Sequence, residues 1–103
     1  MRMDQHHTGL SQPLLSKIEM LAKSSQMDLV ILFGSRARGD FKDKSDIDLA
    51  VSGRGFTKFI LALDEETPTL LQYDVVNLDR DIDDVLLHEI QRDGIVLYRK
   101  EDA

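Results

Sequence analysis

The chain has 103 residues and no cysteine, which excludes disulfides, thiolate catalysis and cysteine-type zinc sites. Its hydrophobic fraction of 42% and charged fraction of 31% are those of an ordinary globular chain, and no apolar run approaches the ~20 residues that span a bilayer. A net charge of −6 argues against a module that holds nucleic acid unaided, because neutralising phosphates needs clustered lysine and arginine. We therefore expect one cytoplasmic domain, residues 10–103, behind a poorly ordered polar segment, residues 1–9.

The first helix and strand of this domain have clear sequence signals. Apolar residues at helical spacing follow Ser11 and Pro13, which are helix start signals, and predict a helix over residues 10–24. The continuous apolar run 29–33 predicts a strand buried on both faces, and Gly34 ends it.

A short arginine-rich segment leads from this strand to the next. Residues 35–39 predict a brief helix or turn that begins at the serine, and a charged loop follows over residues 40–44. Residues 46–52 alternate polar and apolar side chains, which is typical of a strand with one polar face. Asp46 and Asp48 would lie together on that face.

The second half of the chain predicts two further helices, each followed by a strand. One helix begins at residue 56 and stops before Pro68, and residues 70–78 predict the third strand. A last helix would begin in the acidic run 79–84, and residues 95–98 would follow as a short edge strand. The buried stripe of this last helix would consist of Ile82, Val85, Leu86 and Ile90. The order of elements predicts an α+β fold, in which helices flank a small mixed β-sheet.

Three carboxylates would meet if the third strand lies beside the second. Adjacent strands are ~4.8 Å apart, so Asp74 could come level with Asp46 and Asp48. Such close carboxylates repel one another, and a hard cation such as Mg²⁺, which prefers oxygen ligands, would hold them together. Gly34 and Ser35 would supply a phosphate grip, since glycine lets the backbone approach a phosphate and the serine lies at a helix N-terminus. The pattern therefore predicts a metal clamp joined to a triphosphate site.

The sequence excludes two other motifs, because residues that they require are missing. The spacing from Gly34 to Gly39 begins like a P-loop, but Asp40 and Phe41 stand where that loop needs lysine and then serine or threonine. An EF-hand that starts at Asp46 lacks the required glycine and glutamate.

The motif residues also resemble a known family. Gly34-Ser35, ten intervening residues and then Asp46-Ile47-Asp48 resemble the signature of the polymerase-β-like nucleotidyltransferases. Residues 34–39, Gly-Ser-Arg-Ala-Arg-Gly, are similar to its minimal nucleotidyltransferase (MNT) branch, and the likeness covers most of the chain. Small members of this kind are typically antitoxins paired with a HEPN-domain ribonuclease. The resemblance implies that they silence this toxin by transferring AMP from ATP to one of its tyrosines.

The resemblance assigns the metal ligands. Asp46 and Asp48 would hold two Mg²⁺ ions that bridge the triphosphate of ATP. Asp74 matches the family's third carboxylate, and would complete the second metal site and help to deprotonate the attacking hydroxyl.

The resemblance also assigns the phosphate-binding residues. Ser35, supported by Gly34, would bind the distal phosphates, and Arg38 and Arg36 would offset their charge. The acceptor would arrive on the HEPN partner, because ~100 residues leave little surface for a separate acceptor domain. Neither a membrane nor direct binding of nucleic acid is expected.

Two alternatives remain open at this point. The chain could be a non-catalytic antitoxin that neutralises its toxin by binding alone. It could also transfer a nucleotide to a small molecule such as an aminoglycoside, although the relatives that do so carry an added helical domain.

Overall fold

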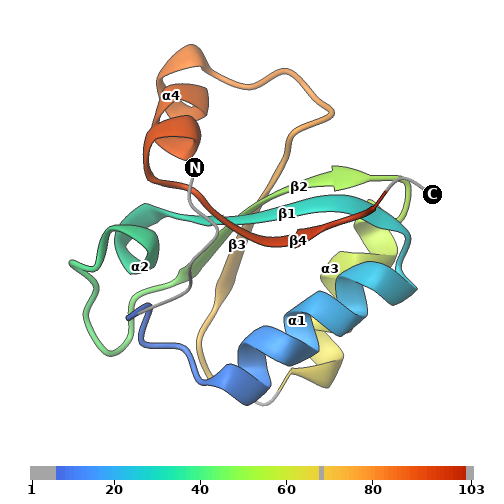
Figure 1. Ribbon diagram of the computed structural model, residues 1–103, viewed down its shortest axis with the longest axis horizontal. Helices are drawn as coiled ribbons and strands as arrows, with labels where there is room; N and C mark the ends of the chain where they lie inside the picture. The colour runs from blue at the N-terminus through green and yellow to red at the C-terminus, as the bar shows by residue number, and fades with distance from the viewer. Residues whose placement is uncertain (1–6, 68, 102–103) are drawn as a thin grey trace.

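The computed structural model in Figure 1 describes residues 7–67 and 69–101. Most of the segment predicted to be poorly ordered, residues 1–6, and the predicted helix stop, Pro68, lie outside the described residues. The helices are α1 (Gln12–Ser24), α2 (Gly34–Arg38), α3 (Phe56–Glu66) and α4 (Asp84–Asp93). The strands are β1 (Met27–Phe33), β2 (Ile47–Gly53), β3 (Tyr73–Asn77) and β4 (Ile95–Arg99). Their order along the chain is the predicted one.

One mixed sheet contains all four strands, in the order β3-β2-β1-β4. β1 pairs antiparallel with both β2 and β4, whereas β2 and β3 are parallel. A parallel pair needs a crossover connection, and α3 supplies it. β4 is an edge strand, as predicted, and β3 is the opposite edge.

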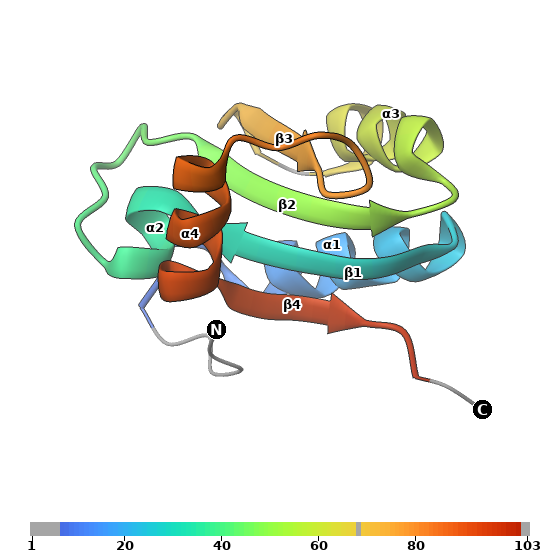
Figure 2. The same ribbon diagram turned by 90° about the horizontal axis from the view of Figure 1, so that it is seen from above.

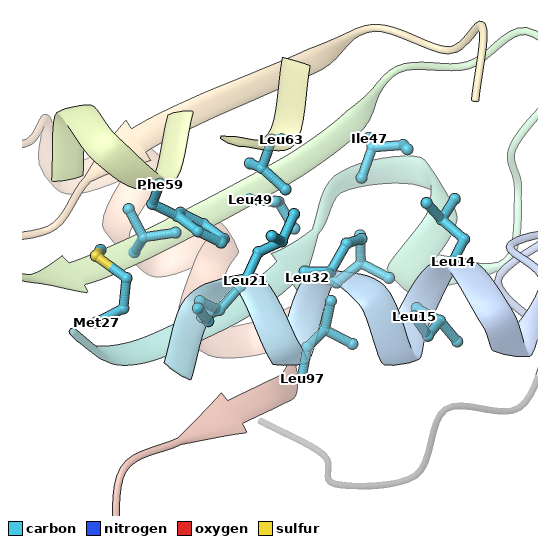
Figure 3. Packing of buried hydrophobic residues seen from close by; sticks show 14 of the residues in the cluster. Leu14, Leu15, Leu21, Met27, Leu32, Ile47, Leu49, Phe59, Leu63 and Leu97 are labelled. Carbon is cyan, nitrogen blue, oxygen red and sulfur yellow. The ribbon is translucent and has the colours of Figure 1, made fainter. Parts of the chain in front are cut away.

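Helices cover both faces of the sheet. α1 and α3 lie on one face, and α4 lies on the other beside α2 (Figures 1 and 2). The larger core lies under α1 and α3, where Leu21, Phe59 and Leu63 pack against Leu32 and Leu49 (Figure 3). A smaller core on the α4 face consists of Ile31, Phe33, Ala50, Ile90 and Val96. The two cores together bury β1 and β2 on both faces, as the continuous apolar run predicted for β1.

The predicted start of the first helix is confirmed in detail. Ser11 is the N-cap of α1, and its side chain accepts a hydrogen bond from the backbone N–H of Leu14 over 3.2 Å. Pro13 lies in the first turn, where its missing N–H is not needed. These local signals place the apolar face of α1 on the sheet.

The last helix begins later than predicted. Asp79 accepts hydrogen bonds from the Ser52 hydroxyl over 2.6 Å and the Gly53 N–H over 3.0 Å, so the acidic run first closes a turn against the end of β2. α4 starts only at Asp84, so Ile82 of the predicted buried stripe precedes the helix. The predicted stripe is also wrong at Val85, which is 67% exposed.

The third strand is shorter than predicted. β3 begins at Tyr73, and the predicted strand residue Leu70 is fully exposed in the preceding loop. None of the helices formed by the described residues is long and apolar enough to cross a membrane.

Candidate active site

The end of β1 and the starts of β2 and β3 lie side by side at one end of the sheet. β1 ends at Phe33, which is the register partner of Asp48 near the start of β2. Asp48 is in turn the register partner of Asp74 near the start of β3. The N–H of Ile47 donates to the carbonyl of Gln72 over 2.8 Å and fixes these two starts against each other.

The carboxylates of Asp48 and Asp74 lie on the same face of the sheet. Register partners on parallel strands point to the same side, and the neighbours Ala50 and Val76 along these strands both pack against the smaller core. Asp46, two residues before Asp48, precedes the strand and is exposed. The predicted placement of Asp74 beside Asp48 is confirmed, while the catalytic roles of the three aspartates stay a prediction.

Gly34 lies directly against the carboxylate of Asp48. Its φ of +74° is in the left-handed region, and a Cβ at this position would overlap Oδ2 of Asp48 and lie 3.0 Å from Cγ. Only glycine therefore allows both this turn and this close approach. The contact joins the glycine-serine turn to the Asp-x-Asp motif, as the sequence pattern predicted.

The electrostatics of the site centre on Asp48. Partial burial raises the pKa of its carboxyl, and the neighbouring charges of Asp74 and Asp46 raise it further. Arg38 lies close enough to act in the opposite direction. The folded chain thus holds three like charges near one another with one nearby cation to offset them.

The donor set suits Mg²⁺ together with a nucleotide. Within residues 7–67 and 69–101, no three His, Cys, Asp or Glu side chains converge as a ready-made metal cage. Mg²⁺ does not require one, because it is commonly held by one or two carboxylates, with phosphate oxygens and water completing the shell. The oxygen chemistry and surplus negative charge at Asp48 fit this kind of site.

Ser35 lies in the first turn of α2. It is half-buried, and its carbonyl accepts hydrogen bonds from the N–H groups of Gly39 over 2.9 Å and Asp40 over 3.1 Å. Gly39, with φ +93°, ends α2 in the left-handed conformation. These bonds fix the one-turn helix that carries the serine.

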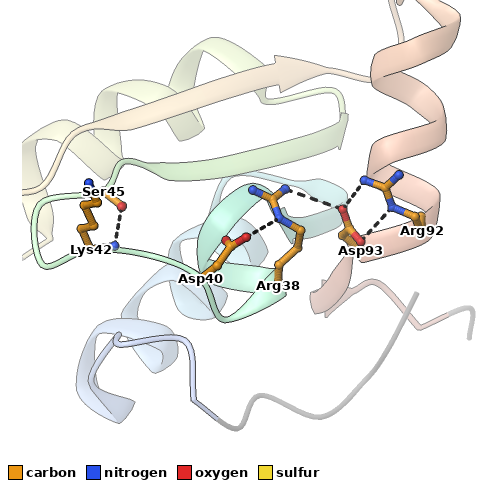
Figure 4. Close-up of polar contacts among 6 residues, drawn as sticks. All are labelled: Arg38, Asp40, Lys42, Ser45, Arg92 and Asp93. Carbon is orange, nitrogen blue, oxygen red and sulfur yellow. Dashed lines mark hydrogen bonds and ion pairs between the residues drawn. The ribbon is translucent and has the colours of Figure 1, made fainter.

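Arg38 is held at the edge of the site by two carboxylates (Figure 4). Its Nε donates to Asp40 over 3.2 Å, and its Nη1 lies 3.7 Å from Oδ2 of Asp93 on α4. Arg92 grips both oxygens of Asp93, at 3.0 and 2.9 Å, and this pairing holds the pKa of Asp93 below its ordinary value. Sequence reasoning missed Asp93, since nothing in the letters shows that the end of α4 reaches α2.

The structure corrects the phosphate-binding role predicted for Arg36. The side chain is 2% exposed, and its hydrogen bonds go to backbone carbonyls of the chain. A guanidinium enclosed in this way presents no free face to a nucleotide. The prediction failed because these carbonyl partners come from segments that the local motif does not include.

Two concave regions of the described surface lie away from the carboxylates. One, of about 1440 Å³, lies between the end of α1 and β4, and includes Lys23 and Tyr98. The other, of about 630 Å³, lies between α3 and the start of β3, on the face opposite Asp74. The candidate active site therefore lies at the open end of the sheet, where β1 ends and β2 and β3 begin, and in neither of these cavities.

Comparison with known proteins identifies the family. The family model for polymerase beta nucleotidyltransferases matches residues 16–103. The chain belongs to this family. The predicted α+β, polymerase-β-like fold of this nucleotidyltransferase is thus confirmed.

Part of this nucleotidyltransferase is similar to a curated relative. A Methanocaldococcus jannaschii protein, provisionally named a protein adenylyltransferase, is 47% identical over 47 residues, which are 46% of this chain and 45% of the relative. The chain thus matches less than half the length of that relative.

Two solved structures support the same fold. A toxin–antitoxin structure with AMP-PNP has a TM-score of 0.63 and 25% identity, over 84% of this chain and 74% of the other. A variant of the MntA–HpeT toxin–antitoxin has a TM-score of 0.66 at 24% identity, over the same shares of the two chains. This nucleotidyltransferase therefore has the fold found in that toxin–antitoxin pair.

Proposed function

We propose that this nucleotidyltransferase moves AMP from ATP, with Mg²⁺, to a hydroxyl of a HEPN-type toxin, and acts as its antitoxin. The acceptor would be a tyrosine. The observation that carries the proposal is the contact of Gly34 with Asp48, with Asp74 in register beside it. This contact puts a phosphate-binding turn and two carboxylates at one edge of the sheet.

In this proposal, different residues of the chain bind the metal and the phosphates. Asp46, Asp48 and Asp74 would hold Mg²⁺, which supplies positive charge against the triphosphate when bound. Ser35 binds a phosphate oxygen through its hydroxyl, and Arg38 offsets phosphate charge from the edge of the site.

The transfer is a substitution at the α-phosphorus of ATP. The acceptor oxygen bonds to that phosphorus as the bond to the β-phosphate oxygen breaks, and pyrophosphate leaves. Asp74, exposed at the start of an edge strand, accepts the proton of the attacking hydroxyl. Its position at an open edge suits an acceptor that arrives on another macromolecule.

The comparisons support a protein acceptor. The M. jannaschii relative is named for protein adenylylation, and the structural relatives are parts of toxin–antitoxin pairs, one of them with an ATP analogue. The net charge of −6 disfavours a nucleic-acid acceptor. We place the reaction in the cytoplasm, where ATP is available.

The test uses ATP labelled at the α-phosphate, Mg²⁺ and the toxin encoded beside this gene. The wild type is expected to label the toxin, whereas the same reaction with label at the γ-phosphate leaves it unlabelled. Asp48→Asn is expected to lose labelling by about 100-fold or more, because it removes a central charged ligand. Asp28→Asn is the control, since Asp28 is exposed near the start of β1, at the far end of the sheet from the site.

The outcomes separate the alternatives. An unlabelled toxin that is still inhibited, and equally inhibited by the Asp48→Asn variant, would end the enzyme proposal in favour of inhibition by binding alone. Label that appears on an aminoglycoside in a drug panel, and not on the toxin, would reassign the acceptor to small molecules.

A further inference from the structure

Arg36 lies on α2 and donates hydrogen bonds to the loop that leads into the site. We propose that Arg36 is a positioning residue, which fixes the approach to Asp46 by tying the loop over residues 40–45 to the segment before α1. The inference rests on the proposed function, because it concerns the metal-holding carboxylates. It gives residues 7–9, which lie outside the motif, a role in that site.

The loop half of the tie acts on the backbone next to Asp46. Nε of Arg36 donates to the carbonyl of Ser45 over 3.1 Å, and this carbonyl belongs to the peptide bond that joins Ser45 to Asp46. Nη2 donates to the carbonyls of Asp43 over 3.1 Å and Lys42 over 3.5 Å. One planar guanidinium thus gathers three carbonyls of a single loop, a geometry that lysine cannot reproduce.

The turn that Arg36 gathers is also closed from within. The N–H of Lys42 donates to Oγ of Ser45 over 2.8 Å (Figure 4), and the N–H of Ser45 donates back to the carbonyl of Lys42 over 3.0 Å. These two bonds close the turn, and the hydrogen bonds of Arg36 determine where the turn lies relative to α2. Asp46 follows it directly along the chain.

The other half of the tie is the segment before α1. Nη1 of Arg36 donates to the carbonyl of Thr8 over 3.0 Å, and Thr8 is itself 2% exposed. Gly9 has φ +73°, and a Cβ there would overlap the Phe41 ring and lie 2.7 Å from Nη1. The Phe41 ring lies 4.9 Å from Cζ of Arg36 and contributes a cation–π contact.

The backbone carbonyls and the Phe41 ring around Arg36 form a site that suits a guanidinium. A buried cation is costly unless its donors are paired. Among the described residues, the donors of Arg36 are paired with backbone carbonyls rather than with a carboxylate, and Asp43 adds a longer-range attraction. Residues that orient ligands from behind typically change metal affinity by roughly 10- to 100-fold when they are replaced. Arg36 acts in this way through the backbone of Ser45.

The experiment measures Mn²⁺ binding by electron paramagnetic resonance, together with thermal unfolding and the kinetics of AMP transfer. Arg36→Met keeps the length of the side chain and is expected to weaken Mn²⁺ binding by roughly 10-fold or more, with kcat falling more than KM for ATP changes. Arg36→Lys is expected to fall between this variant and the wild type.

Two deletions test the other half of the tie without altering Arg36. Removal of residues 2–9 takes away the carbonyl of Thr8 and is expected to weaken Mn²⁺ binding in the same direction. Removal of residues 2–6 leaves that carbonyl in place and is expected to leave Mn²⁺ binding unchanged. Gly9→Ala serves as a third variant, and keeps the test decisive if Arg36→Met does not fold.

The results distinguish this inference from the proposed function. Wild-type Mn²⁺ affinity in folded Arg36→Met, Gly9→Ala and the 2–9 deletion, with only their melting temperatures lowered, would overturn the positioning role. Absence of AMP transfer by the wild type itself would overturn the proposed function instead, while the Mn²⁺ measurements still decide the role of Arg36.

Discussion

Gly34→Ala tests the contact between the glycine-serine turn and Asp48. The left-handed φ of +74° at Gly34 disfavours an L residue by about 1–2 kcal/mol. The added Cβ would also lie 3.0 Å from Cγ of Asp48, whereas ordinary contact begins at 3.4 Å, and it would overlap Oδ2. The carboxylate or the turn must therefore move by about 1 Å, and a displacement of that size can reduce a catalytic rate by about 100-fold.

Gly39→Ala is the matched control. Gly39 also has a left-handed φ, +93°, but nothing lies within 4 Å of a Cβ at this position. Both variants are expected to lose about 1–2 kcal/mol of unfolding free energy, because both strain the backbone. Only Gly34→Ala is expected to lose about 100-fold in kcat/KM for AMP transfer, because only that change displaces a carboxylate.

Urea unfolding gives the two free energies, and transfer of labelled AMP to the toxin gives the two rates. The rise in melting temperature on addition of Mg²⁺ with AMP-PNP provides a readout that does not depend on the acceptor. Equal loss of transfer and of this thermal shift in both variants would refute the reasoning, since backbone strain alone would then account for the effect.

Three further predictions concern the surroundings of the site. Asp79→Ala is expected to lower the free energy of unfolding by about 1 kcal/mol at pH 7. Hydrogen bonds lower the pKa of Asp79 in the folded state, so this difference from the wild type should shrink as the pH falls through that lowered pKa. Urea titrations at several pH values can check this. Asp93→Asn weakens the hold on Arg38, and steady-state kinetics are expected to show a KM for ATP raised several-fold with kcat nearly unchanged. Tyr73→Phe removes the hydrogen bond that the phenol donates to Thr67 over 2.9 Å; calorimetry should show a loss of about 1 kcal/mol, while AMP transfer remains at the wild-type rate.

Much of the fold could be predicted because its signals are local. The buried run that forms β1 and the cap at Ser11 each depend on neighbouring residues, and the structure confirms them. The second strand also forms where it was predicted, but the face that was predicted to be polar is buried at Ala50, under the smaller core. The meeting of Asp48 and Asp74 could also be predicted, since alternation fixes the face of each strand and pairing fixes the level.

The failures depend on contacts that are distant in sequence. Arg36 looks like a phosphate ligand in its motif, but its partners include a carbonyl 28 positions earlier. The acidic run looks like a helix start in the sequence, but Asp79 bonds to the end of β2, and α4 begins only at Asp84. Periodicity within one segment carries no information about such contacts.

Because Asp74 lies exposed on an edge strand, it can change in evolution without a change in the fold. Asp74 is exposed, so its replacement removes no buried contact and leaves the rest of the sheet intact. Under the proposed function, a single codon change at Asp74 would therefore abolish AMP transfer, while the domain still folds and still binds its partner. Antitoxins that modify their toxin and antitoxins that only bind it could then descend from one ancestor, with every intermediate sequence still able to fold.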